Sequence, residues 1–168
     1  MDISRTERRN PKSMHFDRLP TDEMATLVIT ANYEAVRAAE DARAAVAAAA
    51  DAAAEAFGNG GRLFYVGAGT SGRIGVMDAA ECPPTFGVPR EQVQGILAGG
   101  PERMFRAGED EEDDGASGRA AVAEHGIGAQ DVVVGLSAAG NAAFVVGALE
   151  EAARRGAVTV AVSSNPAA

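Results

Sequence analysis

Four short apolar segments divide the second two-thirds of the chain, and none of them alternates strictly between apolar and polar residues. They cover residues 63–66, 93–98, 131–136 and 157–162. Helix-length segments separate them, which is typical of parallel strands buried on both faces. The pattern predicts an α/β fold with a parallel sheet flanked by helices. Ligands bind such sheets beyond the carboxyl ends of the strands, where the following loops should meet: 67–72, 99–101 and 136–141.

The first third of the chain has a different pattern. Residues 1–20 form a polar arm, and residues 21–57 are rich in alanine, which predicts one long helix. Thr21 is the expected N-cap, with acidic residues following it in the first turn. We therefore predict two domains, an arm with its helix over 1–57 and a sheet domain over 58–168. The alanine-rich helix needs a surface to pack on, such as a second subunit.

Composition narrows the possible partners. The 168 residues carry a net charge of −9, which disfavours binding to nucleic acid or to an anionic membrane. Residues 132–149 hold no charge, but glycines and polar residues interrupt them, so a strand, a turn and a helix fit better than a membrane span. The single cysteine, Cys82, cannot form an internal disulfide, and residues 1–20 do not read as a secretory signal, because no apolar segment follows them. We expect a cytoplasmic protein in which Cys82 is structural.

A glycine-rich loop follows the first strand directly. Residues 67–72 read Gly-Ala-Gly-Thr-Ser-Gly, which matches the dinucleotide-binding pattern. That reading needs an acidic residue at the end of the second strand, and residues 97–100 supply none. Two hydroxyls beside free N–H groups at a helix N-terminus suit a terminal phosphate instead. The predicted ligands of a phosphorylated small molecule are Gly69, Thr70, Ser71 and Gly72. A nicotinamide site and a turn without ligand remain alternatives, and the role of Arg73 stays open.

Two acidic positions are candidates for proton transfer. Glu81 precedes Cys82 and two prolines, so we expect a rigid, shielded carboxyl able to act as an acid, or else a local cap or ion pair. Residues 109–114 are six consecutive acids, which are typical of a solvated loop. One of them turned inward could be a general base, but composition does not select which. A straight run is poor geometry for a metal, and we expect no metal and no cofactor.

Residues 67–86, from the glycine loop to Phe86, resemble the signature of the N-acetylmuramic acid 6-phosphate etherases almost continuously. This family consists of lyases with the sugar isomerase (SIS) fold. Shorter matches lie at residues 61–63, 98–100, 131–135 and 165–166, and more weakly at Thr6, Glu7 and Asn10. The resemblance covers nearly the whole chain but only the front part of the family, whose members are nearly twice as long. It therefore implies a sheet domain that is incomplete after its fourth strand.

The resemblance also implies an activity. The family cleaves the lactyl ether of a 6-phosphorylated muramic acid, giving N-acetylglucosamine 6-phosphate and D-lactate in cell-wall amino sugar recycling. Its acid falls on Glu81, and its base falls on Glu112 within the pattern Glu-x-x-Glu-Asp at 109–113. The expected partners are a phosphorylated amino sugar and a second copy in a homodimer. The alternatives are an aldose–ketose isomerase and a non-catalytic sugar-phosphate sensor.

The chain departs from the family after its third strand. Relatives typically read Ala-Ser-Gly-Arg-Thr-Pro-Tyr, whereas residues 138–144 read Ala-Ala-Gly-Asn-Ala-Ala-Phe. Hydroxyls are therefore missing at Ala139 and Ala142. Ser137 and Asn141 remain as the predicted substrate contacts of this loop. Loss of one charge-assisted hydrogen bond would weaken binding by about 1.5–3 kcal/mol.

Overall fold

The computed structural model describes residues 5–108 and 110–165. It divides into two compact units, residues 1–50 and residues 51–168. The boundary falls within helix α2 (Arg43–Gly58). The second unit holds the sheet and the helices and turns from the last turns of α2 onward.

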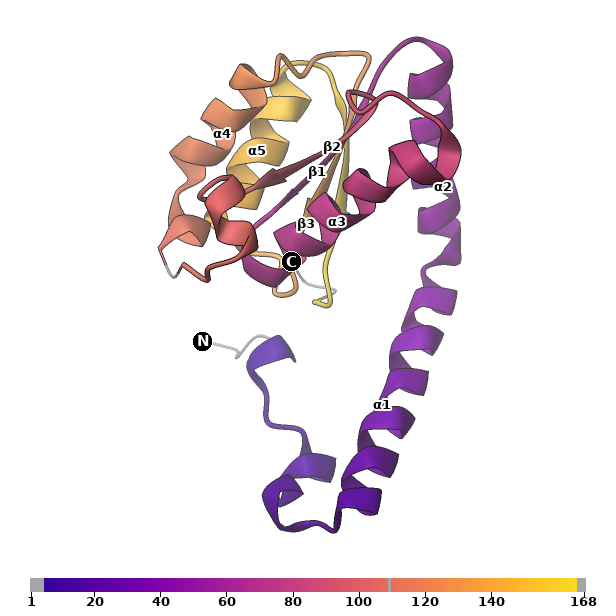
Figure 1. The fold of residues 1–168 in the computed structure, drawn as a ribbon, viewed down its shortest axis with the longest axis vertical. Coiled ribbons are helices and arrows are strands. Elements are labelled where there is room, and N and C mark those ends of the chain that lie inside the picture. The colour runs from indigo at the N-terminus through magenta and orange to yellow at the C-terminus, as the bar shows by residue number, and fades with distance from the viewer. Residues whose placement is uncertain (1–4, 109, 166–168) are drawn as a thin grey trace. The chain divides into compact units, whose positions relative to one another are not determined.

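The sheet of the second unit is parallel throughout, as the strand pattern predicts (Figure 1). Its strands are β1 (Leu63–Gly67), β2 (Val93–Leu97), β3 (Val132–Leu136) and β4 (Val158–Val162). They are ordered β2-β1-β3-β4. Gly67 pairs in register with both Leu97 and Leu136, so the strands end in one line. The three loops that the sequence places beyond the strands therefore leave the sheet at one common edge.

Helices cover both faces of this sheet (Figure 1). Helices α4 (Gly115–Glu124) and α5 (Ala143–Arg154) pack on one face around a core that includes Phe64, Val122 and Phe144. Helix α3 (Gly69–Phe86) and the last turns of α2 contribute to a second cluster, which includes Ala56, Ala79 and Val132. The three layers explain why the strands are apolar on both sides.

Two predictions about the N-terminal helix are wrong. The first unit contains three 3₁₀ turns, η1 (Arg5–Glu7), η2 (Pro11–Ser13) and η3 (Phe16–Arg18), followed by α1 (Thr21–Asp41). The single helix expected over 21–57 is two helices, because Ala42 is not helical and α2 starts at Arg43. Thr21 is not the N-cap either. Pro20 takes that position, with a φ of −55° and a ψ of 149°, and Thr21 is the first residue of the helix.

Helix α3 contains two prolines. It begins at Gly69, within the glycine loop, and continues through Pro83 and Pro84 to Phe86. The fixed φ of proline is compatible with helical backbone, so the two rings remove N–H donors without forcing an immediate end. Gly87 then ends the helix at a φ of +68°, and its N–H donates to the Pro83 carbonyl over 2.9 Å.

The uncharged stretch at residues 132–149 is divided between elements. It forms β3, a loop and the first half of α5. Within the described ranges, no helix has both the length and the apolar character needed to cross a bilayer.

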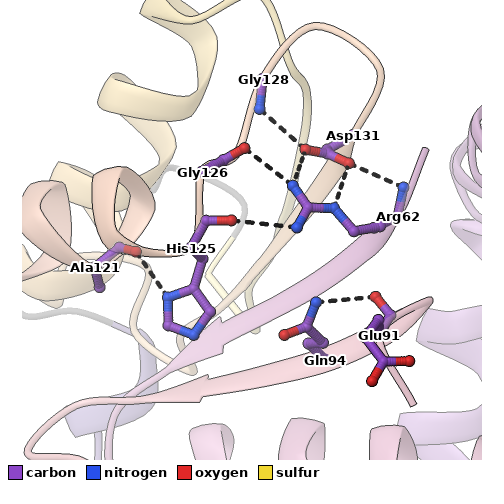
Figure 2. A network of polar contacts seen from close by, with 8 residues as sticks. All are labelled: Arg62, Glu91, Gln94, Ala121, His125, Gly126, Gly128 and Asp131. Carbon is purple, nitrogen blue, oxygen red and sulfur yellow. Dashed lines mark hydrogen bonds and ion pairs between the residues drawn. The ribbon is translucent and has the colours of Figure 1, made fainter. Parts of the chain in front are cut away.

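A polar network closes the amino end of the sheet, opposite the three loops (Figure 2). The Arg62 guanidinium donates to both carboxylate oxygens of Asp131, at 3.1 and 2.8 Å. It also donates to the carbonyls of His125 and Gly126, at 3.2 and 3.0 Å. The Gly128 N–H donates to the same Asp131 carboxylate. These bonds fasten the loop between α4 and β3 to the start of β1.

Candidate functional site

Helix α3 begins in close contact with the end of β1. A Cβ on Gly67 would lie 2.6 Å from the Cα of Gly72, and a Cβ on Gly72 would lie 2.5 Å from the Leu97 side chain. Only glycine permits this approach. Ala68 is the N-cap and has no side-chain acceptor, so the first N–H groups of α3 have no intrahelical or capping partner. The positive end of the helix dipole is therefore presented at the sheet edge, where an anion is favoured.

A cavity of about 340 Å³ opens beside this helix terminus. Its wall combines the start of α3, the end of β2, the 3₁₀ turn η4 (Pro101–Met104) and the 3₁₀ turn η5 (Glu111–Asp113). The lining residues are Ala68, Gly69, Arg73, Ala98, Arg103, Gly108, Glu111 and Glu112. This volume falls within the roughly 300–1,000 Å³ that small-molecule sites occupy.

Four charged side chains define the electrostatics of the cavity. The Arg73 Nε donates to the backbone carbonyl of Arg103 over 2.8 Å. The Arg103 guanidinium forms an ion pair with Glu111. Glu112 lines the same wall, and among the described residues no ion-pair partner lies within 4 Å of it. The cavity thus combines an anion-binding helix terminus with a carboxylate that can accept a proton.

The predicted residues of the glycine loop lie close together. Gly69 lines the cavity, and Thr70 and Ser71 occupy the first turn of α3 beside it. Thr70 is exposed and Ser71 is half-buried, whereas Gly72 is buried beneath the turn. Gly72 is thus placed where close packing of helix on strand requires it.

The other predicted substrate contacts lie in the loop after β3, at the same sheet edge. Ser137 is half-buried, and its Oγ accepts from the Gly140 N–H at 3.1 Å. Asn141 is exposed. The Ser163 hydroxyl holds this loop by donating to the Ala138 carbonyl over 3.2 Å. Neither Ser137 nor Asn141 is among the residues that line the cavity.

Glu81 is separated from the cavity along α3. It follows Gly69 by twelve residues, which at 1.5 Å per residue places it about 18 Å along the helix axis. We expected a shielded carboxyl, but Glu81 is exposed, because it lies on the outer face of α3. The structure therefore brings Gly69 and Glu112 together and leaves Glu81 apart from both.

Two groups close to Glu81 have raised pKa values, the Cys82 thiol and the Tyr65 hydroxyl. Burial raises the pKa of the Cys82 thiol, and the nearby Asp78 carboxylate acts in the same direction. The Cys82 Sγ donates to the Asp78 carbonyl over 3.4 Å. Burial also raises the pKa of Tyr65, with a further contribution from its hydrogen bond to Asp78. A thiol with a raised pKa is a weak nucleophile at neutral pH, which supports a structural role for Cys82.

Sequence reasoning left Arg73 undecided and did not single out Arg103 or Glu111. Arg73 follows Gly69 by four residues, so helical spacing alone places it on the same side of α3 as the cavity. Arg103 and Glu111 carry no comparable signal, because two irregular turns bring them together.

The fold is a parallel sheet between two helical layers. The start of α3 packs on β1 through glycines and lies beside a charged cavity. Together these features define a SIS domain. The chain belongs to the family described as the glucokinase regulatory protein N-terminal SIS domain, whose model matches residues 45–153.

Similar curated proteins carry a more particular name. The chain is 48% identical over 162 residues to the N-acetylmuramic acid 6-phosphate etherase of Crocosphaera subtropica, and 50% identical over 161 residues to that of Rippkaea orientalis. Each match covers 96% of this chain and 53% of the relative. The etherase of Mesorhizobium japonicum is 46% identical over 167 residues, which cover 99% of this chain and 54% of the relative. The chain thus spans about half the length of these relatives and corresponds to their N-terminal part.

A solved structure shares the fold. The phosphoheptose isomerase of Neisseria gonorrhoeae superposes with a TM-score of 0.54, covering 83% of this chain and 74% of that one. Its sequence identity is 20%, so the likeness concerns the fold alone.

Proposed function

We propose that this chain is the N-terminal part of an etherase-like lyase. Its substrate is N-acetylmuramic acid 6-phosphate, and its products are N-acetylglucosamine 6-phosphate and D-lactate. The observation that carries the proposal is the cavity in which Gly69, at the start of α3, and Glu112 meet. The 46–50% identity to proteins named etherases supports this choice of substrate among the phosphorylated sugars.

The phosphate binds at the first turn of α3. There the N–H groups of Gly69, Thr70 and Ser71 and the helix dipole favour an anion, and the two hydroxyls add donors. This local arrangement attracts a phosphate even though the whole chain is acidic. The loop with Ser137 and Asn141 leaves the sheet at the same edge and contacts the sugar.

The reaction is an elimination followed by a hydration. In the open-chain aldehyde, Glu112 removes the C2 proton, which the neighbouring carbonyl acidifies. The released electron pair forms the C2–C3 double bond as the C3–O bond breaks. Glu81 protonates the departing ether oxygen, and lactate leaves. Water then adds at C3, and C2 regains a proton.

The position of Glu81 means that this reaction needs a second copy of the chain. Glu81 lies about 18 Å along α3 from Gly69, where the phosphate binds, and about 12 Å from Arg73, the nearer lining residue of the helix, so it does not reach the cavity of its own chain in this structure. We therefore propose that a homodimer places Glu81 of one copy at the cavity of the other. Ile74 and Met77 are 54% and 60% exposed and lie on the same stripe of α3 as Glu81, which gives the second copy an apolar surface to contact.

Two isosteric substitutions test the assignment. Glu112→Gln should abolish exchange of the substrate C2 proton in deuterated water, because the base is lost. Glu81→Gln should preserve exchange and block lactate release, because only the acid is lost. Proton NMR follows the exchange, and a coupled assay follows the lactate. Full exchange by Glu112→Gln would show that the base lies elsewhere.

Mixing the two variants tests the shared site. Random pairing of Glu112→Gln and Glu81→Gln chains restores one complete site in half of the dimers, so about a quarter of the wild-type lactate release should return. No recovery, with exchange of subunits confirmed by mass spectrometry, would place both residues in one chain's site.

A non-catalytic sugar-phosphate sensor is the second candidate. It is favoured by the loop after β3, where Ala139 and Ala142 carry no hydroxyl. A sensor would bind N-acetylglucosamine 6-phosphate without exchanging the C2 proton of the muramic acid phosphate. Binding by calorimetry beside the exchange measurement separates the two functions.

A further inference from the structure

A continuous set of polar contacts runs from α3 across the cavity wall to the acidic run. It begins at Arg73, whose Nε donates to the Arg103 carbonyl over 2.8 Å. It continues through the ion pair between the Arg103 side chain and Glu111. Glu111 is the residue before Glu112, and all four side chains line the same cavity.

Two glycines make room for this set. A Cβ on Gly99 would lie 2.7 Å from the Arg103 Cγ and 2.9 Å from the Glu111 Cγ, and a Cβ on Gly108 would collide with the Glu111 carboxylate. Gly99 also has a φ of +76°, which turns the chain from β2 toward η4. The side chain of Glu111 is 23% exposed, whereas residues 110 and 112–114 are exposed. Glu111 is therefore the member of residues 110–114 that is turned inward.

The segment that carries Glu112 is short and irregular, although it lies against α5 and continues into α4, whose N-cap Asp114 accepts from the Ser117 N–H. Turn η5 is three residues long, and its neighbours are acids that repel one another. Its backbone bond from the Asp113 N–H to the Asp110 carbonyl is long, at 3.4 Å. A 3₁₀ turn of this length is not stable by itself. The contacts from Arg73 and Arg103 are what connect it to the rigid start of α3.

We propose that Arg73, Arg103 and Glu111 are positioning residues that hold Glu112 in place at the cavity. The Arg73–Arg103 hydrogen bond fixes η4 on α3, and the ion pair fixes η5 on η4. Glu112 then keeps one position relative to the phosphate-binding turn, and so relative to C2 of the bound sugar. This inference rests on the proposed function, in which Glu112 is the base.

The experiment compares proton removal with binding in single variants. Arg103→Gln, Glu111→Gln and Arg73→Met should each slow C2 proton exchange by about 10- to 100-fold, because a misplaced base loses its attack geometry. The Kd for N-acetylglucosamine 6-phosphate, measured by calorimetry, should change less than about threefold, because the phosphate contacts remain. Arg106→Gln, an exposed position in the same loop, removes the same charge and should change neither quantity.

Coupling between the variants identifies the ion pair. The double variant Arg103→Gln with Glu111→Gln should be no slower than either single variant, because both remove one interaction. The reversed pair, Arg103→Glu with Glu111→Arg, should recover at least part of the rate. Additive losses without recovery would overturn the positioning role. A loss of sugar-phosphate affinity parallel to the loss of rate in Arg73→Met would make Arg73 a direct ligand instead.

Hydrogen–deuterium exchange separates a failure of this inference from a failure of the proposed function. Amide protection over residues 110–118 should fall in Arg73→Met and Arg103→Gln and stay unchanged in Arg106→Gln. This holds whether or not the wild-type chain removes the C2 proton. A wild-type chain without C2 exchange would contradict the proposed function, whereas unchanged protection in all variants would contradict the positioning role.

Discussion

Asp131 is the buried charged residue of the described chain, with 5% of its surface exposed. Burial by itself raises the pKa of this carboxyl, but hydrogen bonds from the Arg62 side chain and the Gly128 N–H outweigh that effect. The pKa of Asp131 therefore lies below its ordinary value. The Arg62 guanidinium also lies over the Phe64 ring, 4.8 Å from its centroid, which joins this polar network to the core.

We predict that Asp131→Asn lowers the free energy of unfolding by about 3 kcal/mol at pH 7, because the Arg62 cation loses its partner. A lowered folded-state pKa contributes stability above the unfolded value of about 3.9, and that contribution is lost as pH falls through the folded value. The difference from wild type should therefore shrink below about pH 4. Urea unfolding at several pH values measures it.

The exposed Asp51 in α2 provides the matched control. Asp51→Asn removes the same charge and should stay within about 0.5 kcal/mol of wild type at pH 7. A penalty for Asp131→Asn that is equally small at pH 7, or that grows on acidification, would contradict the role assigned to the ion pair.

At the scale of elements, backbone contact between α4 and α5 determines how one face of the sheet is covered. A Cβ on Gly118 would collide with the Phe144 carbonyl oxygen, and a Cβ on Gly147 would collide with the Gly115 carbonyl oxygen. At these two glycines the helices therefore touch backbone to backbone. The obstacles are backbone atoms, which cannot move aside as a flexible side chain can.

We predict that Gly118→Ala destabilises the protein by about 3 kcal/mol, despite the higher helix propensity of alanine, because the helices must separate. Gly58→Ala is the control, since nothing lies within 4 Å of the added Cβ and the φ of Gly58 is not positive. It should be neutral or stabilising by up to about 1 kcal/mol. Chemical denaturation of both variants gives the comparison. Equal stability of the two would mean that α4 and α5 adjust without cost.

At the scale of the whole molecule, apolar surface remains uncovered in each unit. Helix α1 has no buried residue, and its exposed Ile29, Tyr33 and Val36 follow helical spacing along one stripe. In the second unit, β4 forms one edge of the sheet, with Val158 and Val162 about half exposed. The stability of a helix such as α1 is marginal in water without a packing surface, because most helical stability comes from packing.

We predict that the chain self-associates in solution, most simply as a dimer, through a contact that includes the α1 stripe. Ile29→Lys with Val36→Lys should shift the molar mass measured by light scattering toward the monomer. Ala31→Lys with Ala38→Lys adds the same charge on the opposite side of α1 and should leave the mass unchanged. Equal dissociation by both pairs would indicate charge repulsion rather than loss of a specific contact, and a monomeric wild-type chain would contradict the prediction.

The sequence by itself determined the features that depend on local pattern. Continuous apolar segments gave the four strands and the parallel sheet, because burial on both faces excludes alternation. The glycine loop predicted a helix that starts beside the end of the first strand, because close approach of helix and strand requires residues without Cβ. Counting from residues 99–100, together with the resemblance, selected Glu112 from six acids, and Glu112 does line the cavity. Its role as the base stays a prediction.

Only the tertiary structure decided what depends on residues distant in sequence. It joined Arg73, Arg103 and Glu111 across one cavity wall, since ion pairs between irregular turns leave no periodic signal. It made α3 one continuous helix from Gly69 past Glu81 and so placed Glu81 on an exposed face far from Gly69. Local propensity describes a residue's own backbone, whereas the distance between two side chains depends on how whole elements pack. The sequence therefore named the candidate groups, and the packing of α3, η4 and η5 determined which of them share a site.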